Sequence, residues 1–321
     1  MKIQNPAVPF GSTVVIIGAN GYIGAETCDK FLEAGYRVRG TVRNVEEHRA
    51  WMYELFDKKY AGKFELMQVV DFEAEGAFDE AFKGAAVVVY VSTPTIFDPE
   101  PTKVVDPVVN GTINTLKAAA QAEIILDTYN HEDIRKARQE PTLPTAERAL
   151  TVYGASRAAG ELAFWAWVKN NHPPFVANCV VPDGNFGRVL NAEKTNRTSV
   201  GMLKRVLAGN WSETMNLAWI INVEDTALLM VAAATLPSIA NERIFAYYKQ
   251  ATWNELRLRV RLLYPDRSDL VVGPDSDIVG RDLSNANELV QRAEEVLKEL
   301  GRPGFTSVDD TLRDFVDTCC T

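Results

Sequence analysis

Tyr153 and Arg157 lie four residues apart in a segment, 149–170, whose composition predicts a long helix. Residues at this spacing share one face of a helix, so the guanidinium can lie beside the phenol and hold a cofactor ribose. A neighbouring cation lowers the pKa of a phenol, which then donates a proton more readily to a carbonyl oxygen as hydride arrives. We predict Tyr153 as this acid. The alternative is a tyrosine that only packs on an amphipathic helix.

A glycine pattern near the N-terminus predicts the source of hydride. Gly18, Gly21 and Gly24 follow the apolar run 13–17 and open a predicted helix. Glycines at these places let the backbone approach a pyrophosphate and the helix pack on the strand, while the helix N-terminus offers free N–H groups. A ligand-free strand-to-helix turn would also need glycine. A second apolar strand over 36–42 completes a βαβ unit and favours dinucleotide binding.

Arg43 follows the second strand, where an NAD enzyme of this architecture usually carries a carboxylate for the ribose 2′-hydroxyl. A guanidinium suits a 2′-phosphate instead, so the sequence predicts NADP(H). Arg39 shares the strand face and is a second candidate, although Arg43 is closer to the strand end. Both could alternatively be solvated edge charges. Asp71 and Phe72 end the third strand, where a carboxylate could meet the adenine amino group.

Strands alternate with helices through the first half of the chain, and become rare after Gly187. Alternation of this kind predicts an α/β fold of Rossmann type, with a doubly wound parallel sheet and ligands at the carboxyl ends of its strands. We expect an NADP(H)-binding domain over 1–187, including the Tyr153 helix. A smaller, mostly helical substrate lobe is expected over 188–321, with some of its elements returning to the Rossmann core.

Composition limits the class of partner. A net charge of −9 argues against nucleic acid and anionic membranes. No apolar run approaches the ~18 residues of a membrane span, and no secretory signal is visible, so we expect a cytoplasmic protein. The four cysteines and three histidines lack metal-ligand spacing, so no metal is expected. Nothing separates a monomer from a homodimer.

At this point the chain resembles the extended short-chain dehydrogenase/reductases, in particular dihydroflavonol reductases and fungal or yeast NADPH-dependent aldehyde and ketone reductases. The resemblance covers most of the length. It rests on the stretches Gly18 to Gly24, Gly35 to Arg43, Tyr90 to Pro94, Val109 to Thr112, Tyr153 with Glu161, Pro182 to Gly187, and Leu300 to Gly304.

The resemblance implies an NADPH-dependent reductase of a hydrophobic aldehyde or ketone of secondary-metabolite type. It implies that Arg43 meets the 2′-phosphate and that Tyr153, with Arg157, serves catalysis and the cofactor. The other residues implied at the cofactor are Asn20, Tyr22 and Ile23 in the glycine turn, and Val91, Ser92, Thr93, Pro182 and Asp183 beside the nicotinamide. The residues implied at the substrate are Thr93, Asn185, Phe186 and Met230.

Several departures from the family pattern concern the catalytic site. Arg157 stands where the family has a lysine. The arginine keeps the positive charge but cannot relay a proton. The family also carries a fifth strand ending in a catalytic serine, and this segment is missing after the predicted helix 103–122. Either 124–126 takes the strand position and Thr128 supplies the hydroxyl, or the sheet has a gap. Asp127 matches the family's downstream segment, which favours the gap.

Two further replacements alter the substrate side. Met230 stands where the family often has histidine, and Asp183 replaces asparagine. Three functions follow: a carbonyl reductase, favoured by Arg43 with Tyr153; a redox-silent isomerase, cyclase or lyase that uses Tyr153 or Asp183 for proton transfer; and a non-catalytic NADP(H)-binding protein. Consumption of NADPH separates the first from the second, and a Tyr153→Phe variant separates the third.

Overall fold

The computed structural model describes residues 1, 3–91, 97–117, 129–139, 142–191, 198–212, 217–276 and 284–320. Its first elements are the predicted βαβ unit: strand β1 (Thr13–Ile17), helix α1 (Tyr22–Glu33) and strand β2 (Arg37–Val42). β1 pairs in parallel with β2, and residues 14–16 are fully buried. Burial of an unbroken apolar run is typical of a central parallel strand covered by helices on both faces.

Two more strands complete a four-stranded parallel sheet in the order β3-β2-β1-β4. β3 (Phe64–Gln68) pairs with β2, and β4 (Ala85–Tyr90) pairs with β1. The order places β1 inside the sheet, as in a Rossmann-type fold, so the predicted fold class is confirmed. The helices of this half are α2 (Glu46–Asp57), α3 (Asp79–Phe82), α4 (Val105–Lys117), α5 (His131–Gln139) and α6 (Ala146–Asn171).

Beyond β4, the described strands form separate sheets. Among the described residues, β4 pairs only with β1, and β5 (Cys179–Pro182) pairs only with β8 (Arg243–Ala246). The candidate replacement strand 124–126 and Thr128 lie outside the described residues. Within the described part of the chain no strand joins β4 to β5, so the gap and the replacement strand both stay predictions.

The second half contains more strands than the sequence predicts. β6 (Gly184–Phe186), β7 (Trp219–Asn222) and β9 (Lys249–Gln250) form a third sheet. Strands of two to four residues are too short to show a period of alternation, which is why the sequence pattern misses them. The helices of this half are α7 (Ser199–Leu207), α8 (Val223–Thr235), α9 (Trp253–Leu263), α10 (Asn287–Glu299) and α11 (Val308–Cys319).

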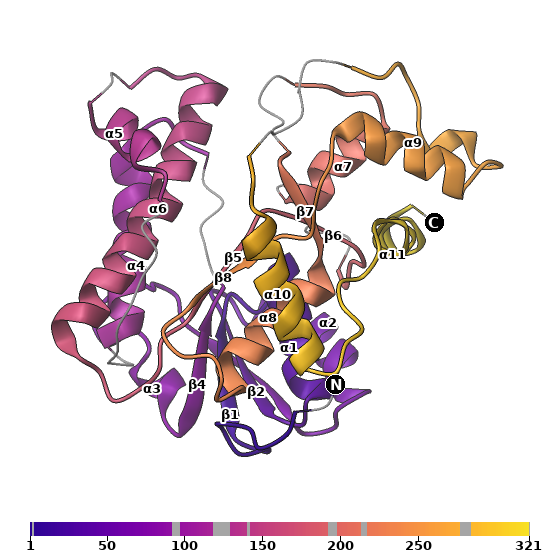
Figure 1. Cartoon of the computed structure of the whole chain (residues 1–321). Helices are drawn as coiled ribbons and strands as arrows, with labels where there is room; N and C mark the ends of the chain where they lie inside the picture. Colours follow the sequence, from indigo (N-terminus) through magenta and orange to yellow (C-terminus); the bar gives the residue numbers. More distant parts are fainter. Residues whose placement is uncertain are drawn as a thin grey trace.

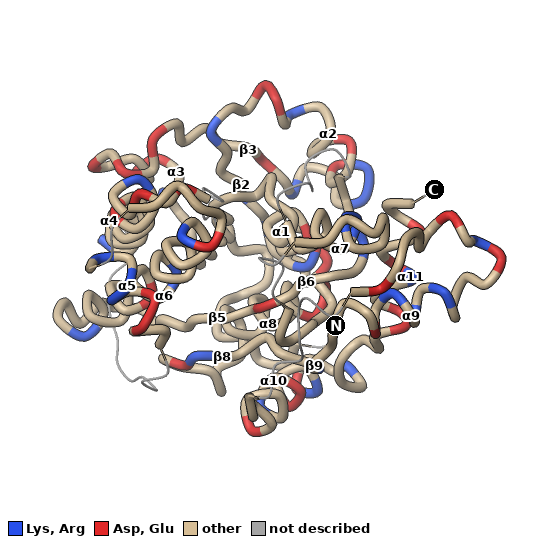
Figure 2. The backbone as a smooth tube through the Cα atoms, turned by 90° about the horizontal axis from the view of Figure 1, so that it is seen from above, with Lys and Arg blue, Asp and Glu red and all other residues tan. Residues whose placement is uncertain are grey.

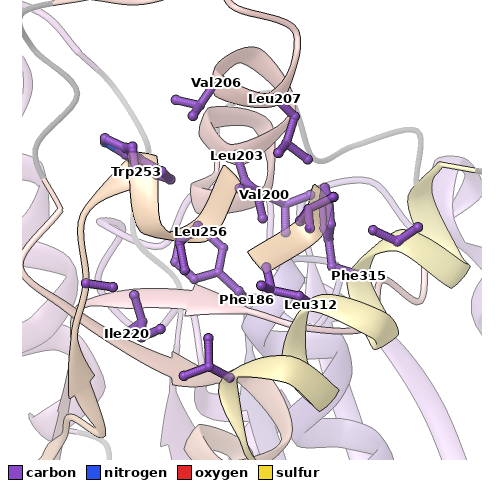
Figure 3. Close-up of a cluster of buried hydrophobic side chains, with 14 of the residues drawn as sticks. Phe186, Val200, Leu203, Val206, Leu207, Ile220, Trp253, Leu256, Leu312 and Phe315 are labelled. Atoms are coloured by element: carbon purple, nitrogen blue, oxygen red, sulfur yellow. The ribbon is translucent and has the colours of Figure 1, made fainter. Parts of the chain in front are cut away.

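Helices α4, α5 and α6 lie on one side of the sheets, and α7, α9 and α11 lie on the other (Figures 1 and 2). α8 instead packs on α1, and with α10 it covers β8. α7, α9 and α11 contribute Leu203, Leu256 and Phe315 to one buried apolar cluster with Phe186 of β6 (Figure 3). The second half thus covers the first sheet and also builds a core of its own, while the domain division at Gly187 stays a prediction.

A buried network of ion pairs joins α1 to the second half. Arg188, just after β6, contacts Glu26 at 2.5 Å, Asp29 at 2.7 Å and Glu224 of α8 at 2.8 Å. Glu26 is only 1% exposed, and burial raises the pKa of its carboxyl against the opposing effect of Arg188. A buried carboxylate without its partner costs several kcal/mol, so this network holds α1 and α8 in one arrangement.

Replacement of Arg188 by leucine should destabilise the protein strongly, because Glu26 would stay buried after losing its two contacts with the guanidinium. We expect the free energy of unfolding, measured by urea denaturation, to fall by about 3–5 kcal/mol. The matched control is Arg267→Leu, which breaks the exposed pair with Asp269 and should cost far less. Equal losses in the two variants would contradict the role given to the network.

Candidate functional site

The glycine turn fits a phosphate because its backbone leaves no space for side chains. Gly18 has a φ of +84°, a conformation that glycine adopts without strain. A Cβ atom at Gly24 would lie 2.0 Å from the carbonyl oxygen of Gly18, and one at Gly21 would lie 3.3 Å from it. The backbone N–H groups of Gly18 and Ala19 donate to the carbonyl of Thr41 in β2, which fixes the turn above the strand ends.

Helix α1 starts at this turn with no side chain capping its N-terminus. The first N–H groups of a helix lack partners within the helix, and the helix dipole adds partial positive charge there. An anion is therefore stabilised at this position. The turn and the uncapped helix together provide the cradle that a nucleotide pyrophosphate requires.

A cleft of about 800 Å³ extends from the glycine turn across the carboxyl ends of β1, β2 and β4. It is bordered at one end by the β2–α2 connection and at the other by α6 and the β5–β6 connection. Of the residues predicted from the sequence, those that line it are Gly18, Asn20, Gly21, Tyr22, Ile23, Gly24, Arg43, Phe72, Val91, Tyr153, Asp183, Asn185 and Phe186.

Arg43 lies in this cleft just beyond β2, with its guanidinium 5.8 Å from the ring centre of Phe72. Glu47 and His48 of α2 also line this end, and the sequence analysis did not identify them. The amide of Asn44 donates to the Glu47 carboxylate at 3.2 Å. The cleft therefore offers a cation and a carboxylate on the same side.

Arg39 does not reach the cleft. Its Nε donates to Glu65 at 2.6 Å, and its Nη1 donates to the carbonyls of Ala81 and Lys83 at 2.7 and 2.9 Å. Alternation along β2 does give Arg39 the same face as Arg43, but four residues of strand separate them by about 13 Å. The expectation that Arg39 binds cofactor is corrected: the structure assigns it to the contact of β2 with β3 and the α3–β4 turn.

Tyr153 lines the other end of the cleft from α6. Its ring centre lies 5.1 Å from that of Phe97, at an interplanar angle of 35°. Arg157 follows one turn later and is largely buried. Burial lowers the pKa of its guanidinium, while the phenols of Tyr153 and Tyr90 raise it. The two residues thus share one face of α6 and interact electrostatically, while the catalytic role of the pair stays a prediction.

The other predicted residues are divided between the cleft and the interior. Asp183 faces the cleft, and one of its oxygens accepts from the backbone N–H of Trp219 at 2.8 Å. Asn185 lines the cleft but is almost fully buried, and its side-chain oxygen accepts from the Thr226 hydroxyl at 2.6 Å. Pro182 ends β5. Ser92, Thr93 and Thr128 lie outside the described residues.

Two candidates lie away from the cleft and are corrections. The Met230 sulfur accepts from Thr27 of α1 at 3.4 Å, because α8 turns this residue toward α1. Asp71 accepts from the backbone N–H of Glu73 at 2.9 Å and caps a turn. Neither residue lines the cleft or the smaller apolar hollow beside Tyr153. Helix periodicity and strand-end position predict where such residues lie along an element, but not which neighbour they face.

A second hollow of about 480 Å³ adjoins the Tyr153 end and shares three apolar residues with the cleft: Phe97, Leu150 and Met202. Pro99, Pro144 and Ala149 add further apolar surface there. Apolar walls with few polar groups are typical of small-molecule sites. Sequence reasoning missed this hollow because segments distant in the chain contribute to it.

Among the described residues, no group of His, Cys, Asp or Glu could hold a metal ion, and no helix is long and apolar enough to span a membrane.

A model of the NAD dependent epimerase/dehydratase family matches residues 14–245, a range that contains the glycine turn, Arg43 and Tyr153. The chain belongs to this family. It is 32% identical to aldehyde reductase 2 of Sporidiobolus salmonicolor and 30% identical to ketoreductase adrE of Penicillium rubens, over 98% and 97% of both chains respectively. The structure of Gre2 from Candida albicans in complex with NADPH shares the fold, with a TM-score of 0.74, 20% identity, and coverage of 97% of this chain and 99% of that one.

Membership of the epimerase/dehydratase family confirms the resemblance to extended short-chain dehydrogenase/reductases. The alignment with aldehyde reductase 2 spans 345 positions, 24 more than the 321 residues of this chain. The relative therefore has at least that many residues without a counterpart here. That these residues include the family's serine strand stays a prediction.

A Gly24→Ala variant should show that the turn depends on the missing Cβ atom. The added methyl group would collide with the Gly18 carbonyl, so α1 would have to move away from β1. We expect the free energy of unfolding in urea to fall by about 3 kcal/mol. Gly21→Ala is the control, because its Cβ would lie 3.3 Å from the same oxygen, a tight contact without a collision, and should cost only about 1 kcal/mol. A Gly24→Ala protein as stable as Gly21→Ala would contradict this geometry.

Proposed function

We propose that this family member is an NADP(H)-dependent reductase of hydrophobic aldehydes or ketones. The observation that carries the proposal is one continuous cleft with the glycine turn and Arg43 at one end and Tyr153 at the other. Relatives named aldehyde reductase and ketoreductase support the same reaction class. The expectation of a cytoplasmic monomer or homodimer is part of this proposal.

The residues present fit the cofactor. The absent Cβ atoms at Gly21 and Gly24 let the turn close on the Gly18 carbonyl, and the uncapped N-terminus of α1 can donate to the pyrophosphate. Arg43 supplies the planar cation for a 2′-phosphate, and Phe72 lies beside that guanidinium. When bound, the reduced nicotinamide supplies hydride to the carbonyl carbon.

Tyr153 completes the reduction by transferring its phenolic proton to the carbonyl oxygen. The nearby Arg157 guanidinium stabilises the phenolate that remains, because opposite charges favour each other most where water is excluded. Hydride on carbon and a proton on oxygen give the alcohol. The apolar hollow around Phe97, Leu150 and Met202 adjoins this position and suits a hydrophobic substrate.

The predicted loss of the family's serine strand favours a second candidate function, and among the described residues no strand extends the first sheet beyond β4. If no hydroxyl group assists Tyr153, carbonyl polarisation is weaker and hydride transfer becomes slower. The second candidate is therefore a redox-silent isomerase, cyclase or lyase in which Tyr153 or Asp183 moves a proton. A third candidate, non-catalytic NADP(H) binding, would use only the glycine turn and Arg43. Product formation without NADPH oxidation would favour the second candidate over the reductase.

Tyr153→Phe should abolish turnover while the cofactor still binds, since only the transferable proton is removed. We expect kcat for NADPH oxidation with a panel of aryl and alkyl ketones to fall roughly a hundredfold or more. The Kd for NADPH, measured by calorimetry, should stay within about twofold because one hydroxyl is lost outside the phosphate sites. Tyr264→Phe, a phenol between α9 and α11, is the control. Undiminished turnover in Tyr153→Phe would remove Tyr153 from the mechanism.

Arg43→Gln should weaken NADPH selectively, because a charge-assisted contact to the 2′-phosphate is lost. We expect the Kd for NADPH to rise about tenfold to a hundredfold and the Kd for NADH to change little. Arg39→Gln should leave the ratio of the two constants unchanged and lower the thermal midpoint instead, since Arg39 contacts Glu65 and two carbonyls. Equal effects of Arg43→Gln on both cofactors would argue against a 2′-phosphate site.

A further inference from the structure

The first turns of helix α2 place a histidine in the wall of the cleft, at the end where Arg43 lies. His48 is only 4% exposed, and both of its ring nitrogens have side-chain partners. Nε2 lies 2.9 Å from the terminal amide of Asn20, the third residue of the glycine turn. Nδ1 lies 3.3 Å from the indole Nε1 of Trp51, one turn further along α2. The indole and imidazole rings meet edge to face, at 87°.

The chemistry of these three groups fixes the position of the imidazole proton. An indole N–H can only donate, so Nδ1 of His48 must be the unprotonated, accepting nitrogen. A neutral imidazole then carries its proton on Nε2 and donates it to the amide of Asn20. A doubly protonated ring would place an N–H against the indole N–H and lose that contact.

The proton on Nε2 in turn fixes the orientation of the Asn20 amide. The amide atom nearest His48 is placed as Nδ2, but the two ends of an amide have the same shape, and the hydrogen bonds decide between them. Since Nε2 of His48 donates, the atom that faces it must be the accepting Oδ1 of Asn20. The amide nitrogen of Asn20, with its two N–H donors, then turns toward the cleft.

We propose that His48 is a positioning residue for NADP(H): through its Nε2–H it holds the amide of Asn20 so that Nδ2 donates to the 2′-phosphate. The inference rests on the proposed function and names how the same site would read its cofactor. The hydrogen bond draws the Asn20 side chain toward α2, on the side of the β2–α2 connection where Arg43 lies. That connection is the place where nucleotide-binding folds of this type read the ribose 2′ substituent.

The charges at this end of the cleft determine which orientation of the Asn20 amide favours a bound phosphate. Arg43 is the cation there, and the Glu47 carboxylate lines the same wall. A carbonyl oxygen of Asn20 turned to the cleft would add an acceptor opposite a phosphate, which has only acceptors to offer. An N–H donor instead adds a charge-assisted hydrogen bond to that of Arg43.

The first test is made without cofactor, on the intact protein at neutral pH. The ¹⁵N chemical shifts of a histidine ring distinguish the two neutral tautomers and the protonated form, and His48→Gln assigns the His48 signals among the three histidines. We expect the Nε2–H tautomer in the wild type. In Trp51→Phe the indole donor to Nδ1 is lost, so part of the His48 population should shift to the Nδ1–H tautomer. An Nδ1–H or doubly protonated ring in the wild type would overturn the assignment.

The second test measures Kd for NADPH and NADH by calorimetry. His48→Leu should raise the Kd for NADPH about tenfold, because one charge-assisted hydrogen bond is lost, and should leave NADH within about twofold. His48→Gln should retain most of the affinity, since a glutamine amide can accept from Trp51 and donate to Asn20. Asn20→Asp should weaken NADPH binding more than either His48 variant does. We expect its Kd for NADPH to rise about a hundredfold, because a carboxylate would face the phosphate.

The outcomes separate this inference from the proposed function. Equal losses for NADPH and NADH in His48→Leu, or failure of His48→Gln to restore affinity while it melts at the wild-type temperature, would overturn the role of His48. Wild-type protein that binds neither cofactor would overturn the contact with phosphate together with the proposed function. Binding of NADPH with no effect of His48→Leu would leave the proposed function standing and this inference refuted.

Discussion

The approach of helix α1 to strand β1 is the constraint on which the rest of the structure depends. Gly24 brings its Cα so close to the Gly18 carbonyl that no Cβ atom can be present. This contact sets the N-terminus of α1 over the strand ends, where its free N–H groups face the cleft. The same helix then carries Glu26 and Asp29 to Arg188, so its position also decides where α8 and the β6 connection lie. Helix α1 thus forms part of the cofactor site at its N-terminus and, through Glu26 and Asp29, also holds the second half of the chain in place.

The two ends of the cleft are built on different elements of the fold. The end with Arg43 and His48 is formed by the ends of β1 and β2, which lie in the four-stranded sheet, and by helix α2. The end with Tyr153 rests on α6, which packs with α4 and α5. Arg157 lies largely buried there and interacts electrostatically with Tyr90 at the end of β4. The departures from the family pattern that the sequence predicts concern this catalytic end and the substrate side.

Much of this arrangement follows from local sequence pattern. The glycine spacing predicts the turn, and the apolar runs predict β1 to β4, because each depends on a single element or on its direct continuation. The spacing of Tyr153 and Arg157 likewise predicts that they share one face of a helix. Arg39 and Met230 show the limit, since strand and helix periodicity select a face but not the neighbour that covers it. His48 is polar and isolated in the sequence, and becomes informative only when packing places Asn20 and Trp51 on its two nitrogens.

In the proposed reaction, hydride passes from NADPH to a carbonyl carbon while Tyr153 protonates the oxygen. The most direct measurement uses NADPH carrying deuterium on the transferable position of nicotinamide C4, with mass spectrometry of the product of a ketone that the enzyme consumes. The account predicts one deuterium on the carbinol carbon of the alcohol for each NADPH oxidised. Product that contains no deuterium and forms without loss of NADPH would contradict it, and would identify a redox-silent proton transfer in the same cleft.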